Sequence, residues 1–156
     1  MNSWTALLIV HGLLAVALLG ALTHQVLSVW VPARKPAVSF VGRFRAVPGA
    51  SYANAVVVLY LLTALLGAVI YAEYRISVRT VLQQLEMRSA EGAFELKEHF
   101  AAIGLGLLPV YWYYWRQPLA PEHARTRAML TSILAFTVWF SFLVGHVLNN
   151  IRGFGV

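Results

Sequence analysis

The chain has 156 residues, of which 60% are hydrophobic and only 12% are charged, and its mean hydropathy is +0.69. A soluble domain is closer to half apolar and a quarter charged, so this composition indicates a membrane protein. The absence of Cys excludes disulfides, thiolate catalysis, iron–sulfur clusters and covalently attached haem. The net charge of +6 comes from basic residues in short loops, which indicates membrane topology and not nucleic-acid binding.

Four apolar segments follow one another along the chain, at about 4–31, 52–74, 94–115 and 128–151. Each is long enough to cross a hydrocarbon layer of ~30 Å as a helix that rises about 1.5 Å per residue. In lipid such segments must be helical, because an isolated strand would leave its backbone groups unpaired. The sequence therefore predicts an all-α fold, an integral membrane four-helix bundle that forms a single domain, 1–156.

The loops between the segments differ in charge. Residues 32–51 carry four basic side chains and no acidic one, and residues 116–127 carry three Arg against one Glu. Basic loops are retained on the cytoplasmic side of a membrane. We therefore predict both of these loops inside and both termini outside, in a bacterial inner (cytoplasmic) membrane.

The connection between the second and third segments, residues 75–93, mixes both charges. Its apolar residues recur with helical spacing, at positions 76, 78, 81, 82 and 85. This stretch either extends the second helix beyond the membrane or forms an extra surface helix between helices two and three. The motif SAEG, residues 89–92, predicts a break before the third helix.

The aromatic motif YWYYW, residues 111–115, lies at the end of the third segment. Trp and Tyr gather at the level of the lipid headgroups, where their apolar rings and polar tips are both accommodated. We predict an interfacial belt here, and a stacking surface for a ring-shaped ligand is the alternative.

Three histidines, His11, His99 and His146, each lie one to two turns inside the outer end of a different segment. Ionisable groups in a bilayer are costly and usually serve a function inside the bundle. Because neutral imidazole binds haem iron, zinc and copper, all three are candidate metal ligands. His99 and His146 are the predicted axial pair of a b-type haem, and His11 is a substitute or a hydrogen-bonding neighbour. Nearby glycines would let a macrocycle approach the backbone, namely Gly12, Gly104, Gly106 and Gly145.

Haem propionates need cationic partners near the membrane surface. Four basic side chains are predicted outside, near that level: Arg75, Arg79, Lys97 and Arg152. The alternative interpretation is that they are ordinary solvated charges. A second alternative is a non-haem metal site. Glu95 and His99 share a helix face at i, i+4, and Glu73 ends the second helix at a similar level.

His24 follows His11 by thirteen residues on the same segment, a spacing that invites comparison with two-haem cytochromes b. Thirteen residues at about 100° each leave the two side chains roughly 140° apart, which argues against a second haem. We interpret His24 and the adjacent Gln25 as packing residues or as a contact for a quinone headgroup.

The stretch HGLLAVALLGALTHQ resembles the first helix of two groups of small four-helix membrane proteins. These are the copper-resistance D-type membrane domain and the haem-binding HemJ-type protoporphyrinogen oxidases. Their early His, mid-helix Gly and later polar residue match His11, Gly20 and His24. The stretch FELKEHFAAIGLGLL, with Lys97 and His99, is similar in style, and the chain also resembles cytochrome b-type membrane anchors. The resemblance covers two of the four helices and implies haem binding.

These features predict a membrane electron-transfer subunit with a b-type haem near the outer, periplasmic face of a respiratory or photosynthetic complex. It would pass electrons between a quinol pool and an external partner, as part of an oxidoreductase. Its expected partners are the lipid bilayer and other membrane subunits. The alternative is a cofactor-free accessory subunit whose histidines form hydrogen bonds between helices.

Overall fold

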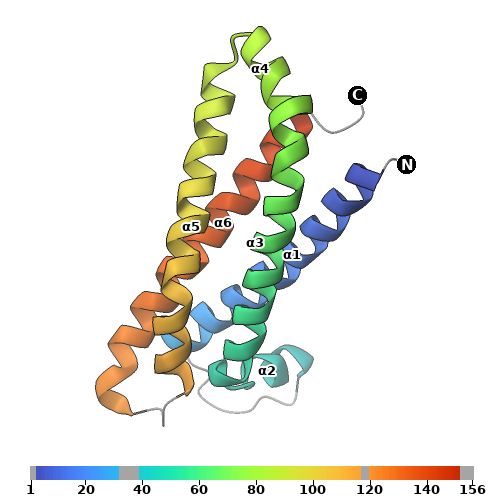
Figure 1. The fold of residues 1–156 in the computed structure, drawn as a ribbon. Coiled ribbons are helices and arrows are strands. Elements are labelled where there is room, and N and C mark those ends of the chain that lie inside the picture. The colour runs from blue at the N-terminus through green and yellow to red at the C-terminus, as the bar shows by residue number, and fades with distance from the viewer. Residues whose placement is uncertain (1–2, 32–38, 117–119, 152–156) are drawn as a thin grey trace.

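Four long helices packed side by side form the molecule (Figure 1). The computed structural model describes residues 3–31, 39–116 and 120–151, and this part of the chain contains helices and turns but no strand. The long helices are α1 (Ser3–Trp30), α3 (Ala53–Tyr74), α5 (Arg88–Arg116) and α6 (Ala124–Ile151). The predicted all-α, four-helix arrangement is confirmed.

The connections contain short helical pieces. Two of them, α2 (Phe40–Arg45) and the 3-10 turn η1 (Gly49–Tyr52), lie between α1 and α3. The π-helical turn η2 (Arg75–Arg79) and α4 (Thr80–Gln84) follow α3, and the 3-10 turn η3 (Pro121–His123) precedes α6. Figure 1 places α2 and η3 at one end of the bundle, and α4 at the other. We call these the inner and outer ends, because the basic loops are predicted to be cytoplasmic.

Three stretches within the described residues are long and apolar enough to cross a membrane. They are Ser3–Trp30, Gly49–Gln84 and Pro121–Ile151. Helix α5 does not join them, because charged residues occupy its first turns and Tyr, Trp and Arg116 occupy its last. Of the four predicted membrane spans, three are thus supported by the length and composition of their helices. That α5 also crosses the membrane stays a prediction.

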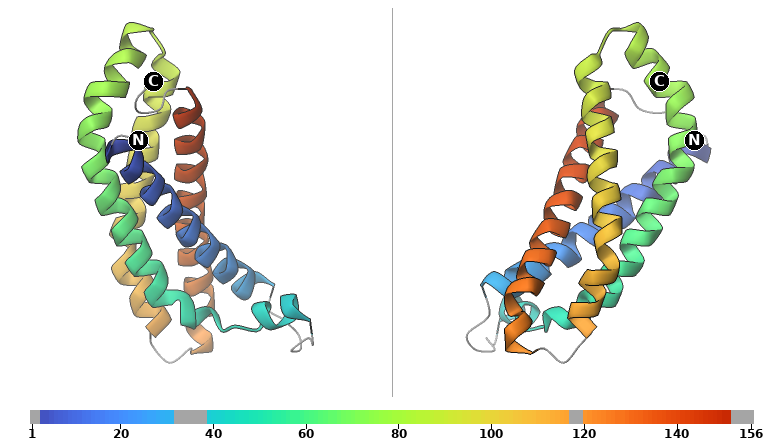
Figure 2. Two further views of the ribbon diagram at one scale, coloured as in Figure 1. Left: turned by 90° about the vertical axis from the view of Figure 1, so that its right-hand side faces the viewer. Right: turned by 60° about the vertical axis from the view of Figure 1, so that its left-hand side comes forward.

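The helices are arranged so that α1 packs on α3 and α6, while α5 packs on α6 and α3. Figure 2 shows α1 crossing the bundle obliquely, with its N-terminal end tilted away from α6. The main apolar core accordingly fills the inner half. Its fully buried members include Leu22, Val56, Tyr111 and Leu134.

The connection between α3 and α5 extends the second helix, which is one of the two predicted arrangements. Helices α3, η2 and α4 form one continuous rod that lies against the start of α5 (Figure 1). A small second core holds them together, with Tyr74, Val78 and Leu82 packed near Ala90 and the α6 residue Leu148. The ring centroids of Tyr74 and Phe94 are 3.9 Å apart.

The turn between α4 and α5 corrects one prediction. Residues 89–92 lie inside α5, and the chain reverses earlier, at Glu86, whose φ is +55°. The amide of Met87 donates to the Leu82 carbonyl at 2.9 Å and the amide of Glu86 to the Gln83 carbonyl at 3.0 Å, a Schellman ending of α4. The SAEG segment does not break the helix because Ala90 packs into the second core, which outweighs the cost of about 1 kcal/mol for Gly92 in a helix.

Candidate functional site

The most fully built polar cluster lies at the inner end, around the buried side chain of Gln25. Its Nε2 donates to the carbonyl of Gly49 at 3.0 Å, and its Oε1 accepts from the hydroxyl of Tyr111 at 2.5 Å. Gln25 therefore links α1, η1 and α5. Because a buried amide without partners costs about 1–3 kcal/mol, these bonds fix how the three elements meet.

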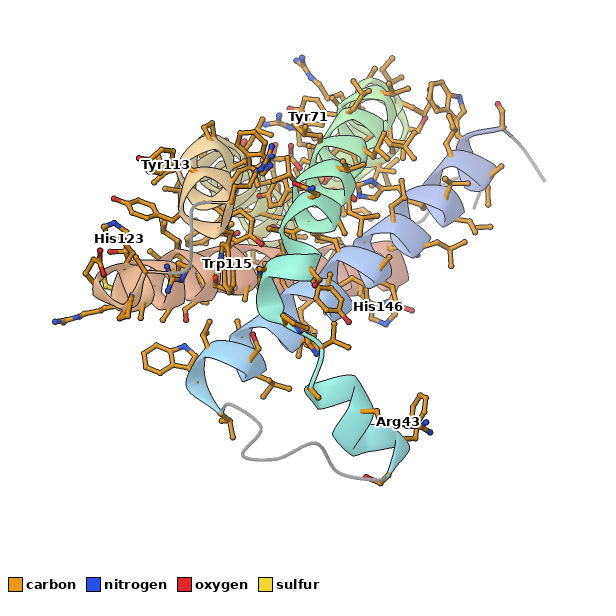
Figure 3. All side chains as sticks on the ribbon, turned by 90° about the horizontal axis from the view of Figure 1, so that it is seen from below. Arg43, Tyr71, Tyr113, Trp115, His123 and His146 are labelled. Carbon is orange, nitrogen blue, oxygen red and sulfur yellow. The ribbon has the colours of Figure 1, made fainter. Side chains whose placement is uncertain are left out.

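Aromatic side chains surround this link. The ring of His24 is buried and stacks on Tyr52, with centroids 4.4 Å apart. Nε1 of Trp115 donates to the hydroxyl of Thr131 on α6 at 3.0 Å. A Cβ on Gly49 would lie 2.9 Å from the Trp115 ring, so the loop approaches α5 as closely as it does because this residue is glycine. Figure 3 shows Trp115 directed among the helices at this end.

The packing interpretation of His24 and Gln25 accounts for these contacts. Both ends of the Gln25 amide are engaged within the chain. A quinone headgroup would have to displace Tyr111 or the Gly49 carbonyl to bind it. A quinone contact at this position stays a prediction.

The predicted aromatic belt divides into two faces. Tyr111 and Trp115 are buried in the core, whereas Trp112 and Tyr113 are exposed. Nε1 of Trp112 donates to Asn54 at 3.0 Å, and the guanidinium of Arg116 lies 4.7 Å from the centre of its ring. The exposed members suit an interface, while the buried members hold the bundle together.

His11 lies on α1 and is partly buried against α3. A Cβ on Gly67 would lie 3.1 Å from Cε1 of His11, so the absence of a side chain at Gly67 makes room for the ring. Its Nδ1 is buried and has no hydrogen-bond partner among the described residues. The ring is also within electrostatic range of Lys97 and Glu98 on α5.

The other two predicted ligands are exposed. His99 lies on the surface of α5, and His146 lies on the surface of α6, where its ring is nearly parallel to that of Phe142. Nδ2 of Asn150 donates to the carbonyl of His146 at 2.8 Å and lies 3.4 Å from its Nε2. Figure 3 places His146 on the opposite side of the bundle from Tyr71 of α3.

The structure does not gather the three imidazoles into one cluster. Within the described ranges, no group of three or more His, Cys, Asp or Glu is placed to hold a metal ion. An axial haem pair needs only two rings, so a haem held by His99 and His146 stays a prediction. Of the glycines considered for a macrocycle, Gly104 is covered by Tyr60 and Gly145 is near Lys97, whereas an added Cβ at Gly12 or Gly106 would meet no atom within 4 Å.

The predicted propionate partners have different surroundings. Arg79 pairs with Glu91 at 2.6 Å and with Glu95 at 2.9 Å, so its guanidinium is already engaged within the hairpin. Arg75 is exposed, 6.0 Å from the centre of the Tyr71 ring. Arg152 lies outside the described residues.

Among the described cations of the outer half, Lys97 is the most covered, with a side chain only 16% exposed. Its ammonium pairs with Glu98 and lies 4.6 Å from the centre of the Phe94 ring. The carboxylates considered for a non-haem metal are bonded elsewhere, since Glu95 accepts from Arg79 and Glu73 accepts from Ser77.

Sequence reasoning missed most of the inner cluster. It singled out Gln25 but not its partners Tyr111 and Gly49, nor the stack of Tyr52 on His24. A signal was present in the sequence, because Tyr111 and Trp115 lie four residues apart and therefore on one helix face that can be buried.

Comparison with known protein families, curated proteins and solved structures finds no match for this chain.

Proposed function

We propose that this chain is an integral protein of a bacterial inner membrane and that it works as one subunit of a larger assembly. The observation that carries the proposal is the exposure of His146 on α6, beside the exposed apolar side chains of Leu143 and Val147. His99 is also exposed, next to Glu98 on α5. The basic loops would lie in the cytoplasm, and both termini and the α4–α5 hairpin would lie outside.

Exposed imidazoles favour an assembled state for an energetic reason. Ionisable side chains at lipid-facing positions are costly and are rare in membrane helices. Polar side chains on such helices commonly form hydrogen bonds to a neighbouring helix. A partner that covers His99 and His146 would remove this cost, whereas lipid chains would not.

Membrane insertion and orientation can be tested by labelling, because the chain has no Cys of its own. Gln84→Cys places a thiol on the exposed hairpin, and Glu122→Cys places one on the exposed inner loop. A membrane-impermeant maleimide added to intact cells should label Gln84→Cys, and should reach Glu122→Cys after lysis only. The reverse pattern would invert the topology, and release of the chain by alkaline carbonate would contradict insertion.

The assembly can be tested by native electrophoresis of mildly solubilised membranes. The double change His99→Ala and His146→Ala should shift the chain to a smaller species, because the partner loses its hydrogen bonds. Leu65→Ala, at an exposed apolar position of α3, is the matched control and should leave the size unchanged. A wild-type chain that migrates as a monomer would contradict the proposal.

A second candidate is the membrane electron-transfer subunit predicted from the sequence. The exposure of His99 and His146 favours it, because both rings are accessible to a ligand shared with a neighbouring chain. These residues would supply axial nitrogens to a b-type haem, which carries one electron at a time when bound. Arg75 is the exposed cation available for a propionate.

An absorption spectrum of the purified chain, before and after dithionite, separates the two candidates. A sharp α-band that is lost in His146→Ala supports haem binding. The control is His123→Ala, at the inner end, which should leave the band intact. A featureless spectrum from an assembled, folded sample would leave the accessory role and exclude the haem.

A further inference from the structure

The guanidinium of Arg127 is buried at the inner end of the bundle, in the first turn of α6, and the residue is only 7% exposed. Its Nη2 donates to the carbonyl of Ala120 at 3.1 Å. Its Nη1 is also buried, and it has no hydrogen-bond partner among the described residues. Burial of an ion is costly unless an opposite charge and hydrogen bonds compensate it. The contacts within the chain supply only part of that compensation.

The acidic residues of the chain are placed where they do not neutralise Arg127. Five of the six lie between residues 73 and 98, and the ion pairs within the described ranges all belong to that outer part. The sixth, Glu122, is exposed in η3. Figure 3 places the neighbouring His123 at the periphery of the bundle. A counter-ion for Arg127 would therefore come from outside the chain.

The depth of Arg127 matches that of lipid headgroups. Thr131, which accepts from Trp115, lies four residues further along the same face of α6 and so about 6 Å deeper in the bundle. On the other side of the core, the exposed Trp30 donates to Ser132 at 2.9 Å. Exposed Trp side chains gather where the hydrocarbon meets the headgroups. Arg127 lies beyond these bonds, on the side predicted to be cytoplasmic.

We propose that Arg127 binds the phosphate group of an anionic phospholipid in the cytoplasmic leaflet. A guanidinium offers paired N–H donors that match two phosphate oxygens, and Nη1 of Arg127 has donors that the chain does not use. Basic sites between helices on the cytoplasmic side are typical places for lipid headgroups. The bond to Ala120 is only partly buried, so the guanidinium lies just beneath the surface. The inference rests on the proposed membrane insertion.

The melting temperature of the full chain in detergent, with added phospholipid, tests this site. Anionic dioleoylphosphatidylglycerol should raise it more than an equal mole fraction of zwitterionic dioleoylphosphatidylcholine, because a ligand of the folded state stabilises that state. Arg127→Gln should lose most of this difference between the two lipids. Arg125→Gln, the matched control, removes the same charge at an exposed position two residues away and should keep the difference.

Other roles for Arg127 predict other patterns. If its only role is to hold the Ala120 carbonyl, Arg127→Gln should lower the melting temperature equally in both lipids, and that result would overturn the site. Equal losses in Arg127→Gln and Arg125→Gln would overturn it too, because they would show a general attraction between basic loops and anionic lipid. Inorganic phosphate at matched ionic strength, without lipid, should stabilise the chain less than phosphatidylglycerol does. An equal effect would identify a soluble phosphate as the ligand and overturn the lipid.

A second variant covers the case in which Arg127→Gln does not fold. Arg127→Lys keeps the charge but not the paired donors, so it should retain only a small part of the difference between the lipids. Retention of the whole difference would overturn the proposed phosphate contact. A membrane-inserted wild type that responds equally to both lipids would overturn this inference alone, whereas absence of the chain from the membrane fraction would contradict the proposed function.

Discussion

The inner and outer halves of the bundle are built on different principles. In the inner half, four helices close around Leu22, Tyr111 and Leu134, and the buried amide of Gln25 is bonded on both sides. In the outer half, the first fifteen residues of α1 are not buried, and His99, His146 and Asn150 are exposed. The contrast indicates that the inner half holds the fold, whereas the outer half is available for contacts with other molecules.

The largest expected effect is at Gly104 in the inner half. A Cβ there would overlap the Tyr60 hydroxyl, which donates to the Ala101 carbonyl at 2.9 Å. Gly104→Val should therefore destabilise the chain by about 3 kcal/mol, through overpacking and the loss of that bond. Thermal unfolding in detergent measures it. Gly106→Val is the matched control, because a Cβ there meets nothing within 4 Å, and equal losses in both variants would contradict the close packing.

The buried amide provides the next test. Tyr111→Phe removes the hydroxyl that donates to Gln25 and leaves a buried acceptor unpaired, at a cost of about 2 kcal/mol. Tyr113→Phe makes the same chemical change at an exposed position of the same helix and should be neutral. If both variants unfold at the wild-type temperature, Gln25 does not hold the inner half together.

A change at the outer turn should act in the opposite direction. Glu86 adopts a left-handed conformation that costs a non-glycine residue roughly 1 kcal/mol, so Glu86→Gly should raise the stability by about that amount. Gln84→Gly, two residues earlier and inside α4, should lower it by about 1 kcal/mol. Unfolding temperatures of the two variants, compared with the wild type, check the sign, and a loss in both would contradict the assigned turn.

The smallest effect concerns the hairpin ion pair. Hydrogen bonds from Gln83 and Arg79 lower the pKa of Glu91 below its ordinary value of 4.5. The stabilisation of the fold by the ionised Glu91 carboxylate is therefore complete above pH 4.5, and it is lost as the pH falls through the lowered pKa. The melting temperatures of the wild type and Glu91→Gln should differ at pH 7 and converge in acid. A difference that persists at low pH would show that charge is not its cause.

The positions of the long helices could be predicted because long apolar runs in lipid must be helical. Helices α1 and α3 begin and end within about one residue of the expected limits. The hairpin turn could not be located in this way. Its position depends on tertiary packing of Ala90 and Leu82, while the local Gly signal at residue 92 pointed to the wrong place.

For the candidate site, the sequence predicts how deep a residue lies in the membrane but not the direction in which its side chain points. Counting residues gives the depth of His99 and His146, but the direction of a side chain depends on which helices its own helix meets. Gly104 faces the core of the bundle, and His99, five residues earlier, is turned about 140° from it. The inner cluster was hidden for the same reason, because Gln25 meets Tyr111 across 86 positions of sequence.

The π-helical turn at Arg75–Arg79 changes the direction in which the side chains of the hairpin face, relative to those of the spanning helix. One additional residue per turn rotates everything beyond it by about 100° about the helix axis. Below the turn, the rod presents Gly67 to α1, and above it the rod presents Leu82 to the second core, which includes Ala90 at the start of α5. One uninterrupted rod therefore serves two sets of neighbours, and the sequence of its outer portion can vary without disturbing the contacts that its lower portion makes in the bundle.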